Sequence, residues 1–195
     1  MSTDLLENII PSKVRRKILQ LFYHHPDNTY YLREVVRQVN EEVNAVKREL
    51  DILYNAKVLS RERRTNKVFY ELNKNYLLYD EFLRVFTKTS ILSEQVISNI
   101  SRLGKVKYIA VSTKYSRKIP LKDDEIYVLF VGIIVVPEVE TIMNEARKEF
   151  GWDINYTVMS EEELKFRKKN NDPFIWKFLK QPKVMLVGQE EDLLK

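Results

Sequence analysis

The sequence predicts an α+β protein with two domains, and three observations lead to this fold class. Residues 29–72 have the pattern of two short amphipathic helices followed by a β-hairpin. From residue 93 onward, helix patterns alternate with short apolar strands, which indicates a small α/β domain with a mixed sheet. The chain has 195 residues, enough to bury two small cores. We therefore expect domains at 1–92 and 93–195.

The composition is that of a globular chain and excludes several classes of protein. It is 44% hydrophobic and 31% charged with only 4 Gly and 6 Pro, so long disordered segments are not expected. Because cysteine is absent, disulfides, thiolate metal sites and cysteine nucleophiles are excluded, and a cytoplasmic location is favoured. The longest apolar run, residues 126–137, is too short to cross a membrane, and residues 1–10 lack the basic start of a signal peptide. No membrane partner is expected.

A first helix is expected at residues 12–23, with Ser12 as N-cap and Pro26 just beyond its end. His24 and His25 follow this helix and raise the question of a metal site. Adjacent side chains on a helix point about 100° apart, and the chain has no other His and no Cys to complete a ligand set. We therefore expect no metal.

Residues 29–55 predict two helices joined by a tight turn. Thr29 is a suitable N-cap for the first helix, and residues 40–42 form the turn. The second helix, residues 43–55, repeats apolar residues at helical spacing and leaves polar side chains facing outward, among them Asn44, Lys47 and Arg48. An ordinary solvated face is the alternative interpretation of these side chains.

The next segment is a hairpin with a cationic tip. Two strands, 57–63 and 67–72, flank a turn at residues 65–66. A helix-turn-helix followed by such a hairpin is a winged helix-turn-helix, which places its second helix in the DNA major groove and its hairpin beside it. The charge agrees, since the net charge is +5 and residues 1–92 hold 16 Lys and Arg against 12 Asp and Glu. Double-stranded DNA is therefore the expected partner.

The residues expected to contact DNA share an exposed position on one of three elements. They are Tyr30, Tyr31 and Arg33 at the start of the first of the two helices, Asn44, Lys47 and Arg48 on the second, and Arg61, Arg63, Arg64 and Lys67 on the hairpin. A winged helix that packs against protein instead of DNA is an alternative.

Residues 10–75 resemble the ArsR-like winged-helix transcription regulators. The resemblance is carried by residues 44–50, NAVKREL, by residues 53–59, LYNAKVL, and by the basic hairpin. It implies the winged-helix fold and DNA binding as a class. Members of this group often sense metals through clusters of Cys, His and Asp, and this chain lacks the thiols.

A further helix is expected at residues 76–90. Its apolar side carries Leu77, Leu78, Phe82, Val85 and Phe86. This stripe is either the seam of a homodimer or a cover for the core of the domain. A two-fold dimer suits DNA because it reads two half-sites, and a homodimer is the expectation.

The second half is expected to alternate helix and strand. The expected elements are a helix at 94–103 closed by Gly104, a strand at 106–112, a polar loop at 114–124, a strand at 125–131, a helix at 138–150, a strand at 153–159, helices at 161–169 and 173–180, and a strand at 183–187.

Residues 93–192 are similar to the minimal nucleotidyltransferases of the DNA polymerase β superfamily. The similarity is clearest at residues 154–160, INYTVMS, at the acidic helix start 161–164, EEEL, and at residues 182–188, PKVMLVG. It implies an αβ fold with a phosphate-binding Gly-Ser pair and strand carboxylates that hold two divalent metals.

The residues that the resemblance requires for catalysis are largely replaced. The Gly-Ser position falls at Val111 and Ser112, and a valine side chain obstructs the close approach of a phosphate. The paired carboxylates fall at Glu125 and Tyr127, and a third acidic position falls near Asn155. We therefore expect no catalytic residues, no cofactor and no enzyme activity. An active nucleotidyltransferase is an alternative, and it requires a register shift that pairs Asp123 with Glu125.

Four side chains near the lost site are candidates for anion binding. They are Ser112, Lys114, Arg117 and Lys118, at the position where phosphates lie in active relatives. A solvated loop is the alternative. The sequence thus predicts a DNA-binding transcription regulator whose second domain is an inactive sensor or scaffold, with a nucleotide or another small effector as a further expected partner.

Overall fold

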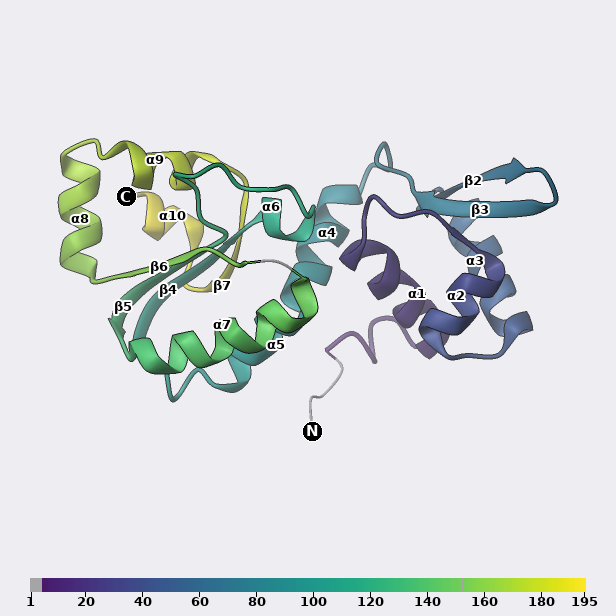
Figure 1. The fold of residues 1–195 in the computed structure, drawn as a ribbon, viewed down its shortest axis with the longest axis horizontal. Coiled ribbons are helices and arrows are strands. Elements are labelled where there is room, and N and C mark those ends of the chain that lie inside the picture. Colours follow the sequence, from purple (N-terminus) through teal and green to yellow (C-terminus); the bar gives the residue numbers. More distant parts are fainter. Residues whose placement is uncertain (1–4, 152) are drawn as a thin grey trace. The chain divides into compact units, whose positions relative to one another are not determined.

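The computed structural model describes residues 5–151 and 153–195, so the first four residues of the predicted domain 1–92 and position 152 lie outside the described residues. The chain divides into two compact units (Figure 1). Unit 1 extends to Phe86 and includes residues 116–118, and unit 2 comprises residues 87–115 and 119–195. The described residues form ten helices and seven strands in two sheets, which confirms the predicted α+β class.

Unit 1 combines helices with a three-stranded antiparallel sheet in the order β1-β3-β2. Its elements are α1 (Lys13–His24), β1 (Tyr30–Tyr31), α2 (Leu32–Val39), α3 (Val43–Asn55), β2 (Leu59–Arg64), β3 (Lys67–Leu72) and α4 (Tyr79–Lys88), the last of which runs on into unit 2.

Local signals in the sequence explain where these helices begin and end. Ser12 is the N-cap of α1 as predicted, because its hydroxyl accepts a hydrogen bond from the Arg15 backbone N–H at 3.2 Å. Asn40 closes α2 in the left-handed conformation, with φ of 50°. The apolar sides of α1, α2 and α3 meet in one core, in which Phe22, Val35 and Leu50 are fully buried.

The start of α2 differs from the prediction. Thr29 is not its N-cap; Tyr31 holds that position, and the side chain of Glu34 accepts a hydrogen bond from the Tyr31 backbone N–H at 3.0 Å. Tyr30 and Tyr31 form the strand β1 and pair with Tyr70 and Phe69 of β3. Aromatic residues favour strands, and a strand of two residues is too short to produce a periodic signal.

Unit 2 is built around a four-stranded mixed sheet in the order β6-β5-β4-β7, as the prediction of a mixed sheet requires. Only β5 and β6 run parallel; β4 is antiparallel to both of its neighbours. The elements are α5 (Ile91–Ser98), β4 (Gly104–Ser112), α6 (Thr113–Ser116), β5 (Val128–Ile134), α7 (Val136–Phe150), β6 (Tyr156–Met159), α8 (Glu161–Lys169), α9 (Pro173–Lys180), β7 (Lys183–Val187) and α10 (Glu190–Leu194).

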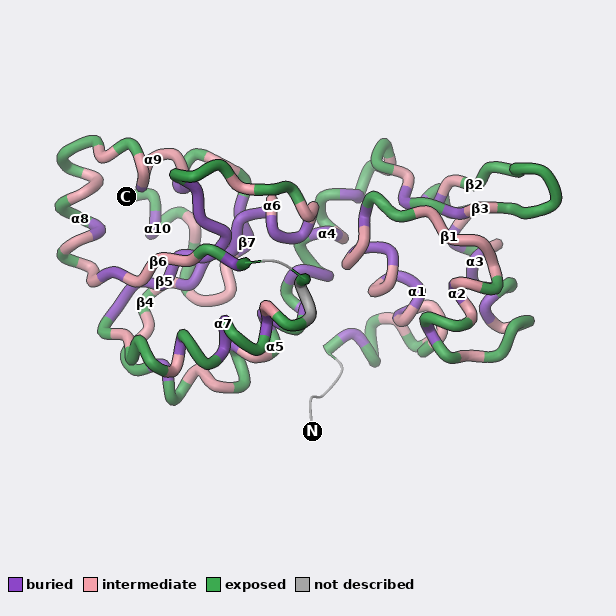
Figure 2. The backbone as a smooth tube through the Cα atoms, in the orientation of Figure 1, coloured by how far each residue is buried: buried purple, intermediate pink, exposed green. Residues whose placement is uncertain are grey.

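The sheet of unit 2 is covered on both faces. One core joins Ile109, Val128 and Phe130 of the sheet to side chains of α5 and α7. The other joins Ala110 and Leu129 to side chains of α8, α9 and α10. Figure 2 shows the resulting buried stretches along β4 and β5. Strands that are covered on both faces read as continuous apolar runs, which explains residues 128–134 within the run at 126–137.

Several predicted elements have different bounds in the structure. The strands expected at 106–112 and 153–159 are β4, which begins at Gly104, and β6, which begins at Tyr156, and the helix expected at 138–150 is α7, which begins at Val136. The helix expected at 94–103 is α5, which ends at Ser98, and Gly104 begins β4 instead of capping a helix. The strand expected at 125–131 begins at Val128, so Glu125 lies in the preceding loop. The loop expected at 114–124 opens with the single turn α6. The helix expected at 76–90 is the shorter α4.

Candidate functional site

The outward face of α3 presents polar side chains over a buried apolar face. Asn44, Lys47 and Arg48 are exposed, whereas Val46 and Leu50 are fully buried beneath them. Within the described part of the chain, the side chains of these three residues form no hydrogen bond or ion pair. They are therefore available to a partner outside the chain.

The first turn of α3 is fixed by a carboxylate. The Glu42 side chain accepts a hydrogen bond from the Ala45 backbone N–H at 2.9 Å. Backbone N–H donors at this helix start hold the pKa of the Glu42 carboxyl below its ordinary value. The helix therefore begins at a defined residue, which sets the direction in which Asn44 and Lys47 project.

Aromatic side chains connect the hairpin to the neighbouring elements. The Arg61 guanidinium lies 4.0 Å from the centre of the Tyr54 ring and 3.3 Å from the Asp51 carboxylate, both on α3. Lys67 Nζ lies 4.1 Å from the centre of the Tyr31 ring. These cation–π contacts orient the two strands of the hairpin against α3 and the start of α2.

The cations at the hairpin tip differ in their pairing. Arg64 is 2.7 Å from the Glu62 carboxylate and lies over the Phe69 ring at 5.2 Å. Arg63 is exposed and, among the residues that the structure describes, has no such partner. Arg63 is thus the arginine of the tip whose charge is not offset by a neighbour.

The residues predicted to contact DNA all lie in unit 1, and their contacts divide them into two groups. Five have side chains that form no hydrogen bond or ion pair in residues 5–151 and 153–195: Arg33, Asn44, Lys47, Arg48 and Arg63. The other five have partners within unit 1: Tyr30, Tyr31, Arg61, Arg64 and Lys67. The second group holds the surface in shape, and the first group is available to bind.

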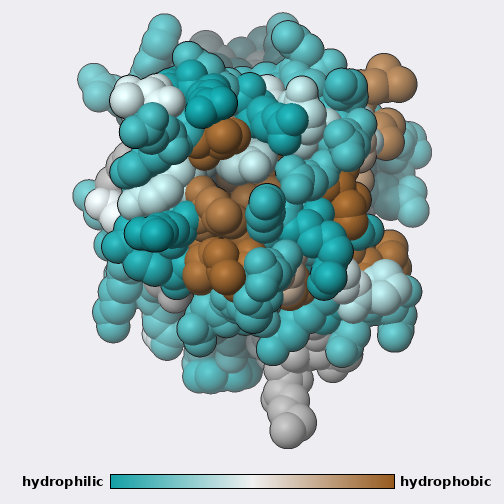
Figure 3. All heavy atoms as spheres, turned by 90° about the vertical axis from the view of Figure 1, so that its right-hand side faces the viewer, coloured by the Kyte–Doolittle hydropathy of each residue, from teal (hydrophilic) through white to brown (hydrophobic). Residues whose placement is uncertain are grey.

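Two exposed side chains near this surface were not predicted. Arg37 lies one turn beyond Arg33 on α2, and the i, i+4 spacing of the two arginines is a signal that could have found it. Val43, the first residue of α3, is 43% exposed. Figure 3, which faces the side of Figure 1 with the hairpin and α3, shows a largely hydrophilic surface with hydrophobic residues between the hydrophilic ones.

In unit 2, Glu125 was predicted to be the remaining carboxylate of a lost metal site, and two lysines lie beside its oxygens. Glu125 is 8% exposed. Its carboxylate lies 2.7 Å from Lys114 Nζ and 3.6 Å from Lys177 Nζ, and it accepts a hydrogen bond from the Lys122 backbone N–H at 3.0 Å. The Lys114 ammonium and this N–H hold the pKa of the Glu125 carboxyl below its usual value.

These contacts do not fit a divalent metal. A metal ion would have to displace the Lys114 ammonium, which already neutralises the buried Glu125 carboxylate. Asp124, the neighbouring acid, pairs with Lys177 at 2.6 Å. The hydroxyl of Tyr127, which was predicted to stand where a second carboxylate is lost, donates to the Ile119 carbonyl at 3.0 Å, so it is directed to the backbone.

The four residues considered for anion binding are divided between the two units. The Ser112 hydroxyl donates to the Gln181 side chain at 3.2 Å, and Lys114 is engaged by Glu125. Arg117 and Lys118 belong to unit 1, where Arg117 pairs with Asp80. Lys118 Nζ lies 3.1 Å from His25 Nδ1. Each of these side chains therefore has a partner within the chain.

Within residues 5–151 and 153–195, no three side chains of His, Asp or Glu lie together as a metal would need. No helix in these ranges combines the length and the apolar character that crossing a bilayer requires. Comparisons with protein-family models, curated proteins and solved structures gave no match to this chain.

Proposed function

We propose that the chain is a DNA-binding transcription regulator in which residues 1–92 form a winged helix-turn-helix. The observation that carries the proposal is the outward face of α3, where Asn44, Lys47 and Arg48 are exposed and without partners in unit 1. Side chains on the early turns of such a helix reach base edges and phosphates. On this proposal α3 is the recognition helix.

The arrangement of unit 1 supports this role for α3. A short turn closed by Asn40 separates α2 from α3, and the hairpin of β2 and β3 follows directly. The contact between Arg61 and Tyr54 fixes the base of the hairpin on the recognition helix. The hairpin then serves as the wing, with Arg63 as its contact to the phosphate backbone.

The charges of the free side chains specify how the protein binds. Arg33, Lys47, Arg48 and Arg63 are cations that form no ion pair within the described residues. Each cation that neutralises a phosphate releases counterions, so the logarithm of affinity falls with the logarithm of salt by about 0.9 per contact. Asn44 carries no charge, and asparagine suits the paired donor and acceptor of adenine.

The proposal includes a homodimer. On and before α4, Leu77, Leu78 and Val85 are 89%, 44% and 37% exposed. Phe86 of the same helix is buried and stacks on Tyr23, so α4 also covers the core of unit 1. A second copy that covers the exposed leucines would give a two-fold protein that reads two half-sites.

Unit 2 is proposed to be a sensor or scaffold without catalytic activity. Its resemblance to minimal nucleotidyltransferases assigns metal binding to a position where Lys114 and Lys177 surround Glu125. Val111, at the phosphate-binding glycine position, is fully buried. A cytoplasmic location belongs to the same proposal, since the chain contains no cysteine.

Fluorescence anisotropy of a labelled random-sequence duplex, measured over a series of salt concentrations, tests DNA binding. The double variant Lys47→Ala/Arg48→Ala should bind more weakly and lose about two units of salt slope, because two phosphate contacts are removed. The matched control Lys105→Ala/Lys148→Ala removes two exposed lysines of unit 2 and should keep the slope.

Selection of bound sequences from a random duplex pool reports the half-sites and their spacing. Two half-sites about one helical turn apart are expected for the dimer. If the wild-type protein binds no duplex at low salt, or if the α3 variant and its control lose the same affinity, DNA recognition by α3 is wrong.

A further inference from the structure

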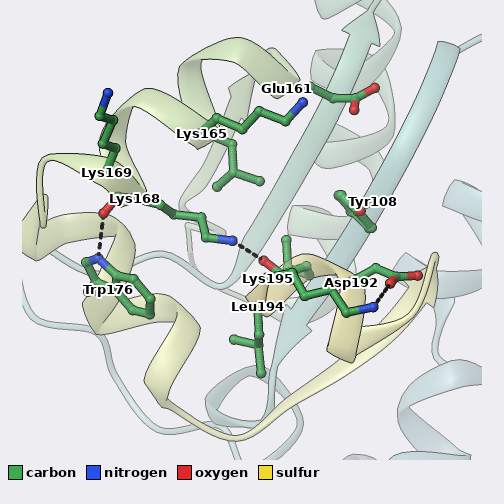
Figure 4. Close-up of a pocket in the computed structure, with 11 residues that line it drawn as sticks. Tyr108, Glu161, Lys165, Lys168, Lys169, Trp176, Asp192, Leu194 and Lys195 are labelled. Atoms are coloured by element: carbon green, nitrogen blue, oxygen red, sulfur yellow. Dashed lines mark hydrogen bonds and ion pairs between the residues drawn. The ribbon is translucent and has the colours of Figure 1, made fainter.

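Unit 2 contains a cavity of about 540 Å³ on the side of the sheet that carries α8, α9 and α10. Figure 4 shows it lined by side chains of these three helices and by Tyr108 of β4. Buried Leu164 and Leu193 form its apolar floor, and the half-buried Trp176 and Tyr108 supply aromatic walls. This volume lies in the range of small-molecule sites.

Hydrogen bonds hold the walls of the cavity in place. Lys168 of α8 reaches toward α10, where its ammonium donates to the Leu193 carbonyl at 2.9 Å (Figure 4). The Trp176 indole N–H of α9 donates to the Lys168 carbonyl at 3.3 Å. Lys168 therefore connects the three helices, and the positions of the aromatic walls are set before any ligand binds.

The polar part of the lining is predominantly cationic. Four lysines line the cavity, Lys165, Lys168, Lys169 and Lys195, against the two carboxylates of Glu161 and Asp192. The Asp192 carboxylate is already paired with Lys195 at 2.8 Å. Lys165 and Lys169 are exposed and form no hydrogen bond or ion pair in the part of the chain that the structure describes.

Lys168 has unused capacity to bind an anion. An ammonium offers three donors, and the contact with Leu193 uses one of them. Partial burial lowers the pKa of Lys168, because the charged form has lost part of its hydration. A bound anion would restore the stabilisation that the missing water no longer provides.

We propose that this cavity binds a small organic anion with a flat apolar body. The body lies on Leu164 and Leu193 beside the Trp176 ring, and the carboxylate or phosphate of the ligand is bound by Lys168, whose ammonium points into the cavity (Figure 4). Lys165 and Lys169 add positive charge at the rim. The site is separate from the lost metal position, where the carboxylate and its lysines satisfy one another.

The shape of the lining favours a small ligand over a nucleic-acid backbone. A duplex presents a row of phosphates and is bound by cations along an open surface. Here the cations surround an apolar floor, and Trp176 lies among them. A ligand that carries both an anionic group and an apolar ring satisfies both parts of the lining.

Tryptophan fluorescence tests the proposal directly. The chain has 2 Trp, so the variant Trp152→Phe leaves Trp176 as the only one, and its emission reports the cavity. We would titrate AMP and phenylacetate, an aromatic phosphate and an aromatic carboxylate, into this protein. Saturable quenching by at least one is expected. Adenosine lacks the anionic group and inorganic phosphate lacks the aromatic ring, so both should bind much more weakly.

The contribution of the lysines is measured in the same background. Lys165→Ala/Lys169→Ala should raise the Kd roughly tenfold, because two positive charges that attract the anion to the cavity are lost. Lys105→Ala/Lys148→Ala removes the same charge from exposed positions outside the cavity and should leave the Kd unchanged. Circular dichroism confirms that both variants are folded.

Three results would overturn the proposal. The first is the absence of saturable quenching by both aromatic anions. The second is equal binding by the two lysine variants. The third is a loss of duplex affinity in Lys165→Ala/Lys169→Ala without any change in ligand binding, which would assign these lysines to a nucleic-acid surface. The ligand titration contains no DNA, so its outcome is independent of the function proposed for unit 1.

Discussion

Arg61 and Tyr54 join the hairpin of unit 1 to helix α3. The Arg61 guanidinium lies 4.0 Å from the centre of the Tyr54 ring, and Asp51, one turn earlier on α3, is 3.3 Å from the same guanidinium. The cross-strand neighbour of Arg61 is the buried Tyr70. Arg61 therefore positions the hairpin, although a count of charges in the sequence groups it with the side chains expected to bind DNA.

The first prediction separates Arg61 from Arg63, which stands two residues further along the same strand. Arg61→Ala should lower the free energy of unfolding by about 1 kcal/mol, because it removes a cation–π contact and an exposed ion pair. Arg63→Ala should leave the stability unchanged and reduce only the salt dependence of DNA binding. Urea unfolding followed by far-UV circular dichroism measures both; equal destabilisation would contradict the positioning role.

The second prediction concerns acid and Glu125. The pKa of its carboxyl is lowered in the folded protein, chiefly by the hydrogen bond from Lys114. The unfolded chain then binds the proton more readily, so this stabilisation is complete above the ordinary carboxyl pKa of about 4.5 and is lost as the pH falls below it.

Glu125→Gln should therefore flatten the loss of stability between about pH 5 and pH 3. Both tryptophans lie in residues 93–195, so tryptophan fluorescence during urea unfolding reports this unit. Asp123→Asn, at an exposed position nearby, is the control and should keep the wild-type profile. A wild-type profile in Glu125→Gln would show that the ion pair with Lys114 does not stabilise the fold.

The third prediction concerns His24, whose ring lies against the end of α4. Its Nε2 donates to the Phe86 carbonyl at 3.3 Å, and burial, with Lys118 nearby, lowers its pKa. Since the unfolded histidine binds a proton at higher pH than the folded one, the stability of unit 1 should fall as the pH drops below about 6.5.

Replacement of His24 tests whether this side chain causes the loss of stability at lower pH. His24→Gln keeps a donor for the Phe86 carbonyl and should reduce the loss of stability between about pH 7 and pH 5. The pKa of His25 is also lowered by burial, so His24→Gln/His25→Gln should reduce the loss further. Thermal unfolding at a series of pH values provides the measurement; an unchanged slope in the double variant would contradict it.

The fourth prediction compares two glycines of unit 2. Gly132, on β5, has φ of 144°, and a Cβ there would lie 2.2 Å from the Lys105 carbonyl oxygen. Gly151, at the end of α7, has φ of 88° and open space around it. Gly132→Ala should cost about 3 kcal/mol, from strain and the clash, against about 1 kcal/mol for Gly151→Ala. Equal costs in urea unfolding would contradict the close strand contact.

Much of the fold could be predicted from local signals in the sequence. Pro173 at the first position of α9 and Ser160 before α8 mark helix starts, and the predicted bounds of α8, α9 and β7 agree with the structure. The strand β1 could not be predicted, because Tyr30 and Tyr31 become a strand only through pairing with β3. The predicted start of β5 at residue 125 was wrong, because the sequence is also apolar at Ile126 and Tyr127, which are buried in a loop.

The candidate sites depended more on contacts between distant residues. The exposed position of the polar α3 side chains could be predicted from helical spacing alone. The pairing of Arg64 with Glu62 could have been predicted from the sequence, because alternate residues of a strand share a face. The contact between Lys177 and Glu125 joins α9 to a loop far earlier in the chain. The cavity around Trp176 likewise forms only when three helices assemble on the sheet, so no local sequence pattern predicts it.

The lysines around Glu125 give this carboxylate a counterion that is part of the polypeptide. A metal ion bound in the same place would be in exchange with solution, so its occupancy would follow the metal concentration and would fall in the presence of a chelator. Lys114 is held beside Glu125 by the fold itself, at 2.7 Å. The negative charge of Glu125 is therefore balanced by the polypeptide itself, and this balance stays constant when the concentration of divalent ions in the surroundings changes.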